Sequence, residues 1–218
     1  MKKFEYFTKK LNILRDFTGE INKKDINQIK EFDKKMEKAV PGYIGSLLFG
    51  SVVKGYSDPT YSDIDLKVLY DPEKADQPSL NHDALEKICS KINKELTSKG
   101  GKSINFSIHP LTERSIDYVF ETKNGGLIYL MADLSRFSTG KKIKEYRDYA
   151  HSKLNEYDDK IQKNIINKVL KSLVEEESKG LDKIADRLSQ IKTKENVYLQ
   201  TRETLWENRL IKLWSKKE

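Results

Sequence analysis

Cysteine and long apolar runs are scarce in this sequence of 218 residues. The single cysteine, Cys89, excludes an internal disulfide, and one cysteine with three scattered histidines argues against a structural zinc site. No apolar run approaches the roughly 18 residues that a membrane-spanning helix needs. Lys9, Lys10 and Arg15 interrupt any apolar core of a signal peptide. We therefore expect a soluble, cytoplasmic protein with no membrane partner.

Charge, in contrast, is plentiful: 34% of the residues are Asp, Glu, Lys or Arg, and the net charge is +7. It is uneven, at +4 over residues 1–40, −3 over 41–135 and +6 over 136–218. Basic flanks favour a polyanionic partner such as nucleic acid or a nucleoside triphosphate. Lysines scattered along solvated helices produce the same balance, so charge alone leaves both interpretations open.

Hydrophobic periodicity divides the chain into a mixed α and β part and a helical part. Apolar residues three and four positions apart predict helices over 4–17, 25–40, 85–96 and 111–121. Alternating or continuously apolar segments predict strands over 43–49, 63–70, 103–109 and 126–131. We expect Asp25 to be the N-cap of the second helix and Pro41 to end that helix.

From about Gly140 onwards the sequence carries only helical periodicity. Segments of this length and period favour a small helical bundle. We therefore predict a mixed domain over residues 1–138 and a helical domain over 139–218. The stretch Ser138-Thr139-Gly140-Lys141 lacks the first glycine and the preceding strand of a phosphate-binding loop, so we interpret it as the N-cap of the long helix.

The most informative stretch follows the first predicted strand. Glycine at position 50 lets the backbone approach another group closely, and Ser51 can open a helix whose free amides hold an anionic phosphate. Asp63 and Asp65 lie two positions apart on a strand, so both carboxylates project from one face within reach of one divalent cation. Paired carboxylates with phosphates as further ligands are the usual way to hold magnesium. Such a metal neutralises a triphosphate.

These residues resemble the signature of a known superfamily. Gly50-Ser51, then Gly55, then residues 62–66 (Ser-Asp-Ile-Asp-Leu) are similar to the signature of the DNA polymerase β-type nucleotidyltransferases. The resemblance covers residues 25–135 and is strongest over 48–66. Within the superfamily the chain resembles the small stand-alone enzymes, in which a basic residue often precedes the second glycine.

The resemblance implies an α+β fold, a short mixed sheet flanked by helices. The helical periodicity beyond Gly140 adds the C-terminal α-helical bundle to this prediction. It implies that Asp63 and Asp65 are catalytic and hold Mg²⁺ or Mn²⁺. By the same resemblance Gly50, Ser51 and Lys54 bind the phosphates of a nucleoside triphosphate. An acceptor hydroxyl would attack the α-phosphate, and pyrophosphate would leave. The region 1–138 would then be the nucleotidyltransferase domain with its N-terminal helices.

One position departs from the family pattern. The superfamily usually has a third carboxylate on the next strand, and the position that fits best here is Asn105. An amide can still contact the nucleotide's metal, but it cannot act as a base at pH 7. Three interpretations stay open: His109 or Glu113 serves as the base, the acceptor is already nucleophilic, or the protein binds a nucleotide without turning it over.

The other basic residues and the acceptor each allow several interpretations. Lys67, Arg136, Lys141 and Lys142 are candidate contacts for the triphosphate, although Lys67 can equally be a structural counter-ion of the aspartates. The acceptor can be an RNA 3′ end, a small molecule such as an aminoglycoside, a protein hydroxyl or a second nucleotide, and a partner protein is possible. The rival functions are a degenerate, antitoxin-like nucleotide-binding module and an RNA-binding protein that uses the basic C-terminal third.

Overall fold

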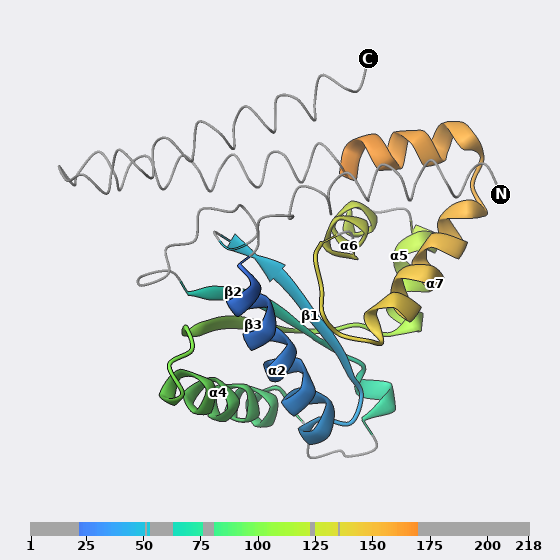
Figure 1. The fold of residues 1–218 in the computed structure, drawn as a ribbon. Coiled ribbons are helices and arrows are strands. Elements are labelled where there is room, and N and C mark those ends of the chain that lie inside the picture. Colours follow the sequence, from blue (N-terminus) through green and yellow to red (C-terminus); the bar gives the residue numbers. More distant parts are fainter. Residues whose placement is uncertain are drawn as a thin grey trace, which may run out of the picture.

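The computed structural model describes residues 22–50, 52, 63–75, 81–122, 125–134 and 136–169. The helix expected over 4–17 and the helices expected beyond residue 169 lie outside these residues, as do Ser51 and Lys54. The described part of the chain is α+β, as predicted (Figure 1). None of its helices is long and apolar enough to cross a membrane.

The labelled elements follow the predicted order with one exception. They are α2 (Lys23–Ala39), β1 (Tyr43–Phe49), β2 (Ile64–Tyr70), the 3-10 turn η1 (Pro72–Lys74), α4 (His82–Ser98), β3 (Ile104–Pro110), α5 (Glu113–Thr122), α6 (Gly126–Leu134) and α7 (Ile143–Asn155). A further helix covers 159–169. The exception is α6, which stands where a strand was expected.

The described residues form one three-stranded mixed sheet in the order β1-β2-β3. β1 runs antiparallel to β2, and β2 runs parallel to β3. Parallel neighbours need a crossover, and α4 supplies it. This arrangement places the end of β1 beside the start of β2, with the start of β3 on the other side of β2.

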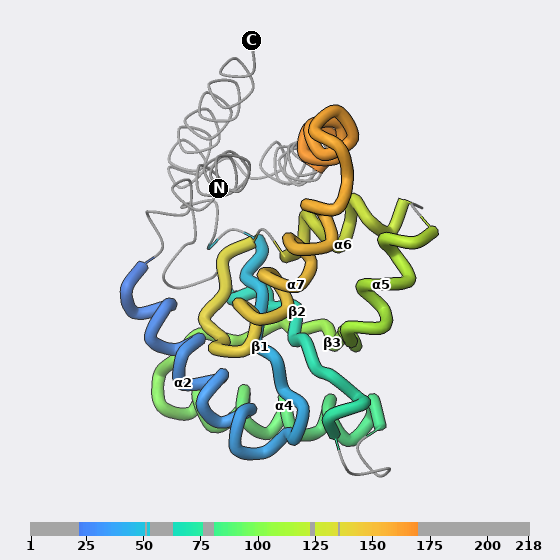
Figure 2. Tube along the Cα trace, turned by 90° about the vertical axis from the view of Figure 1, so that its right-hand side faces the viewer, coloured from blue at the N-terminus to red at the C-terminus, as the bar shows by residue number. Residues whose placement is uncertain are grey.

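One face of the sheet is covered by α2 and α4, which lie together on one side of the strands (Figure 2). Alternate residues of β2 point to this side, so Ile64, Leu66 and Val68 are buried. The buried residues of the two helices recur every three to four positions, as an amphipathic stripe requires. A core of this kind needs no disulfide, and Cys89 lies in it as a free thiol.

The opposite face is covered in part by α5, α6, α7 and the helix over 159–169. Ile44 and Leu47 of β1 and Leu69 of β2 pack into this second cluster. Residues on both sides of the expected boundary at 138/139 therefore share one cluster of buried side chains. The division into domains over 1–138 and 139–218 stays a prediction.

A buried carboxylate ties α2 to the sheet. Asp33 accepts hydrogen bonds from the hydroxyl groups of Tyr43, Ser46 and Thr139, and its side chain is almost fully buried. Burial raises the pKa of Asp33, while the three hydroxyl donors lower it. The network joins α2, β1 and the segment before α7, three parts of the chain that periodicity alone does not connect.

Two predicted helix starts are wrong in detail. The N-cap of α2 is Asn22, whose side chain accepts from the amide of Lys24 at 2.9 Å, and Asp25 is instead buried against Lys102 at 3.1 Å. The segment 138–141 does not cap α7 with a side chain. Ser138 pairs with Leu47 of β1, so this segment adds to the edge of the sheet.

The strand expected over 126–131 is a helix. Leu127, Met131 and Leu134 are buried, and their spacing of four and three is helical. The first six residues alone are a short apolar run, which periodicity cannot assign to either state. The helical period becomes visible only when the window extends to Leu134.

The end of α6 is held by a buried arginine, which yields a testable prediction. Arg147 of α7 donates hydrogen bonds from its guanidinium to the backbone carbonyls of Leu134 and Arg136. Arg147→Met leaves these carbonyls without their charged donor. We expect a loss of about 2–4 kcal/mol in the free energy of unfolding, measured by urea titration.

The matched control for this prediction is Lys144→Met on the same helix. The Lys144 side chain is 82% exposed. Its loss is expected to change the free energy of unfolding by less than about 0.5 kcal/mol. Equal effects of the two substitutions would contradict a role for Arg147 in holding the end of α6.

Candidate functional site

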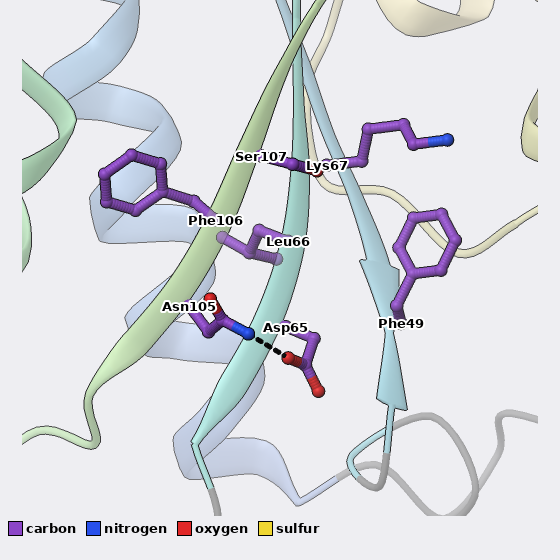
Figure 3. Close-up of a pocket in the computed structure, with 7 residues that line it drawn as sticks. All are labelled: Phe49, Asp65, Leu66, Lys67, Asn105, Phe106 and Ser107. Atoms are coloured by element: carbon purple, nitrogen blue, oxygen red, sulfur yellow. Dashed lines mark hydrogen bonds between the residues drawn. The ribbon is translucent and has the colours of Figure 1, made fainter. Parts of the chain in front are cut away.

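The register of the parallel strands brings Asp65 and Asn105 together. The two residues are direct partners in the pairing of β2 with β3. The side-chain nitrogen of Asn105 donates a hydrogen bond to Oδ1 of Asp65 at 2.9 Å (Figure 3). The residue expected at the place of a third carboxylate is thus in contact with the second aspartate of the sequence motif.

The other side of Asp65 is occupied by Gly50, at the end of β1. Gly50 has φ +70°, a left-handed conformation that residues with a side chain rarely adopt. A Cβ at this position would lie 1.9 Å from Oδ2 of Asp65 and 2.9 Å from its Cγ. The position therefore admits only glycine without a shift of the carboxylate, which explains the glycine of the motif physically.

The first aspartate of the pair, Asp63, is exposed and directly precedes β2. The amide of Ile64 donates to the carbonyl of Ser103 at 2.9 Å, so the chain is already tied to the neighbouring segment at this point. Extended residues two positions apart point to the same side of a sheet. Asp63 and Asp65 thus belong to one face, the face that is only partly covered by helices.

The donor set suits a hard divalent cation. Carboxylate oxygens are the protein ligands that Mg²⁺ and Mn²⁺ prefer, and such ions keep several positions for water or phosphate. Within the described ranges no group of three or more His, Cys, Asp or Glu gathers as a metal cluster. The site fits a cation held by two aspartates with a nucleotide as co-ligand, rather than a metal fully enclosed by the protein.

An open pocket of about 160 Å³ lies on this face of the sheet. Its lining residues come from all three strands and are Phe49, Asp65, Leu66, Lys67, Asn105, Phe106 and Ser107. The side chains of Phe49, Asp65 and Lys67 extend to the same side of the strands (Figure 3). A ligand held at Asp65 would therefore extend over the sheet toward Lys67 and Ser107.

A charged cluster borders this pocket, and the sequence did not predict it. Asp133 of α6 pairs with Lys67 at 2.5 Å and with Arg136 at 3.7 Å. Lys67 and Arg136 both lie over the ring of Phe49, at 5.1 and 3.9 Å from its centroid. Sequence reasoning missed two residues of this cluster: Asp133, which lies beyond the strand expected over 126–131, and Phe49, which was assigned only to the strand expected over 43–49.

The two other candidate bases, His109 and Glu113, contact residues other than Asp65 and Asn105. His109 contacts Ser107 at 3.1 Å and follows Asn105 by four positions, which is about 13 Å along an extended strand. Burial lowers the pKa of His109 and the charge of Lys67 lowers it further, so the neutral imidazole is favoured. Glu113 pairs with Lys74 at 3.5 Å. Lys141 and Lys142 are exposed and do not line the pocket.

The role of Lys67 can be tested by a double-mutant cycle. Lys67→Met and Asp133→Asn, alone and together, are expected to show a coupling of about 1 kcal/mol in the free energy of unfolding. Both side chains are partly shielded, with 20% and 27% of their surface exposed. A coupling near zero in urea titrations would remove the structural role and leave Lys67 as a candidate triphosphate contact.

Comparison with known protein families agrees with this geometry. The family model for the nucleotidyltransferase domain matches residues 26–217. The chain belongs to this nucleotidyltransferase family, which confirms the resemblance to the DNA polymerase β-type superfamily. Neither a curated protein nor a solved structure matches the chain.

Proposed function

We propose that the protein is a Mg²⁺-dependent nucleotidyltransferase. It would move a nucleoside monophosphate from a nucleoside triphosphate to an acceptor oxygen and release pyrophosphate. The observation that carries the proposal is the packing of Gly50 against the carboxylate of Asp65, within a chain of the nucleotidyltransferase family. A glycine so placed keeps backbone, and no side chain, next to the carboxylate that a nucleotide's metal would use.

In this proposal each motif residue has its own role. Asp63 and Asp65 would hold Mg²⁺ or Mn²⁺, which neutralises phosphate charge when it is bound. Gly50, with Ser51 and Lys54 beyond it, would hold the β- and γ-phosphates through backbone amides and one ammonium group. The chain then contributes mainly position and charge, which supply most of the rate in phosphoryl and nucleotidyl transfer.

The direct test is transfer of label from the α-phosphate. ATP, CTP, GTP and UTP, each labelled at the α-phosphate, are incubated with the protein, Mg²⁺ or Mn²⁺, and separate pools of RNA, protein and small molecules. We expect the wild-type protein to transfer label to one of the pools, and the Asp63→Asn/Asp65→Asn variant to transfer none. Nucleotide turnover that persists in that variant would contradict the assignment.

One observation favours a second candidate, a binding-only module. Asn105 is a neutral amide beside Asp65, at the place where the resemblance implies a third carboxylate. A binding-only protein would retain a nucleoside triphosphate without releasing pyrophosphate. Equilibrium binding of each triphosphate, measured beside pyrophosphate release in the same samples, separates the two functions.

A further inference from the structure

The contact between Asn105 and Asp65 restricts how many cations the centre can hold. An ionised carboxylate only accepts hydrogen bonds, so the atom of Asn105 that faces Oδ1 of Asp65 is the amide nitrogen. The N–H group uses one of the acceptor sites of Oδ1 and brings no negative charge to a cation beside it. A carboxylate at position 105 would instead add a second anionic ligand at this place.

Among the residues that the structure describes, the surrounding charges do not compensate for the amide. Two divalent ions about 4 Å apart repel each other four times as strongly as two unit charges at the same distance. Carboxylates that bridge the two ions are needed to offset this repulsion. Asp63 and Asp65 supply two negative charges. Asp133, on the same side of the sheet, already pairs with Lys67 and Arg136. Among the described residues no further carboxylate joins Asp63 and Asp65 in a cluster of three.

The same amide affects the acceptor. As the acceptor oxygen bonds to the α-phosphorus, the bond from that phosphorus to the bridging oxygen breaks, and pyrophosphate leaves with the electron pair. A hydroxyl must also lose its proton in this step, and Asn105 cannot take it. His109, on this face of β3, is about 13 Å along the strand from Asn105. An oxygen that is already an anion has no proton to lose.

We infer that Asn105 limits the centre to one divalent ion, and that the acceptor attacks through an oxygen that is already an anion, that of a phosphate or a carboxylate group. This inference rests on the proposed function and replaces the hydroxyl acceptor that the resemblance implies.

The ion count is tested with Mn²⁺ and the α,β-methylene analogues of ATP and GTP, which bind without transfer. Binding of Mn²⁺ to the full chain is followed by the loss of the free-ion paramagnetic resonance signal. We expect one Mn²⁺ per nucleotide complex in the wild type and two in Asn105→Asp. The control is Ser107→Asp, which adds a carboxylate to the same strand face two positions farther on and is expected to bind one.

The outcomes separate the inference from the proposed function. Two ions in the wild type would overturn the inference and leave the proposed function standing. A folded wild type that binds no nucleotide would overturn both. If circular dichroism shows that Asn105→Asp does not fold, the number of Mn²⁺ ions bound by the wild type alone decides whether the inference holds.

The acceptor class is tested with inorganic phosphate, acetate and glycerol at equal concentrations. Attack by phosphate yields labelled nucleoside diphosphate, acetate yields a mixed anhydride that hydroxylamine traps, and glycerol yields a labelled ester. We expect transfer to one of the two anions to exceed transfer to glycerol at least about tenfold, and Asn105→Asp to raise transfer to glycerol by a similar factor, as general base catalysis contributes. A smaller ratio, including no transfer to either anion, would overturn the acceptor class.

Discussion

Replacing Asp63 and Asp65 together by asparagine is expected to lower nucleotidyl transfer by at least about 10³-fold. The two substitutions remove both negative charges that would hold the metal, while the side chains keep their size. Asp63 is exposed and Asp65 is partly exposed, so neither charge supports the core. The expected change in the free energy of unfolding is below about 1 kcal/mol. Single-turnover transfer and urea titration of the same preparation give the two values.

The matched control is Asp83→Asn, the same chemical change at an exposed residue in the first turn of α4. This helix covers the opposite face of the sheet from Asp65. Transfer is expected to stay within a factor of about two, because a surface substitution far from the site removes no ligand. Transfer by the double variant at the level of this control would end the metal-binding assignment.

Replacing Gly50 by alanine is expected to reduce transfer by at least about 10²-fold and the free energy of unfolding by about 1–3 kcal/mol. The added Cβ would lie 1.9 Å from Oδ2 of Asp65, so the carboxylate must move away from its present position. The left-handed backbone at φ +70° adds strain for any residue with a side chain. Both effects act at the contact that would position the metal ligand.

The substitution Gly100→Ala separates the effect of backbone strain from the effect of the contact with Asp65. The φ of Gly100 is +81°, close to that of Gly50, but a Cβ there would meet no atom within 4 Å. Gly100→Ala is therefore expected to cost about 1–2 kcal/mol of stability through backbone strain alone, with transfer unchanged. If Gly50→Ala loses stability by the same amount but keeps its transfer rate, the contact with Asp65 has no part in the reaction.

Much of the fold could be predicted because its signals are local. The strands at 43–49, 63–70 and 103–109 were recognisable from alternation or continuous apolar character within about seven residues. The amphipathic stripe of α2 and the stop at Pro41 act over the same short range. The wrong assignment of 126–131 has the same origin, because a short run that is apolar throughout shows no polar face to distinguish a helix from a buried strand.

The chemical groups of the candidate site could be predicted from the sequence. The spacing of Asp63 and Asp65 follows from the repeat of a strand, and glycine at position 50 was recognisable from the motif. Asn105 could be identified as the departure from the family pattern. These statements depend on residues close together in the chain or on a known signature.

The contacts between these side chains, in contrast, depend on how distant segments pack together. Asn105 contacts Asp65 across 40 positions of sequence, and Lys67 pairs with Asp133 across 66. The first contact depends on the register of two parallel strands, and the second on where α6 packs over the sheet. Register and helix placement are set by the sum of many buried contacts between distant segments, and no local pattern carries that sum. The charge around Phe49 and the amide beside Asp65 are therefore properties of the packed molecule.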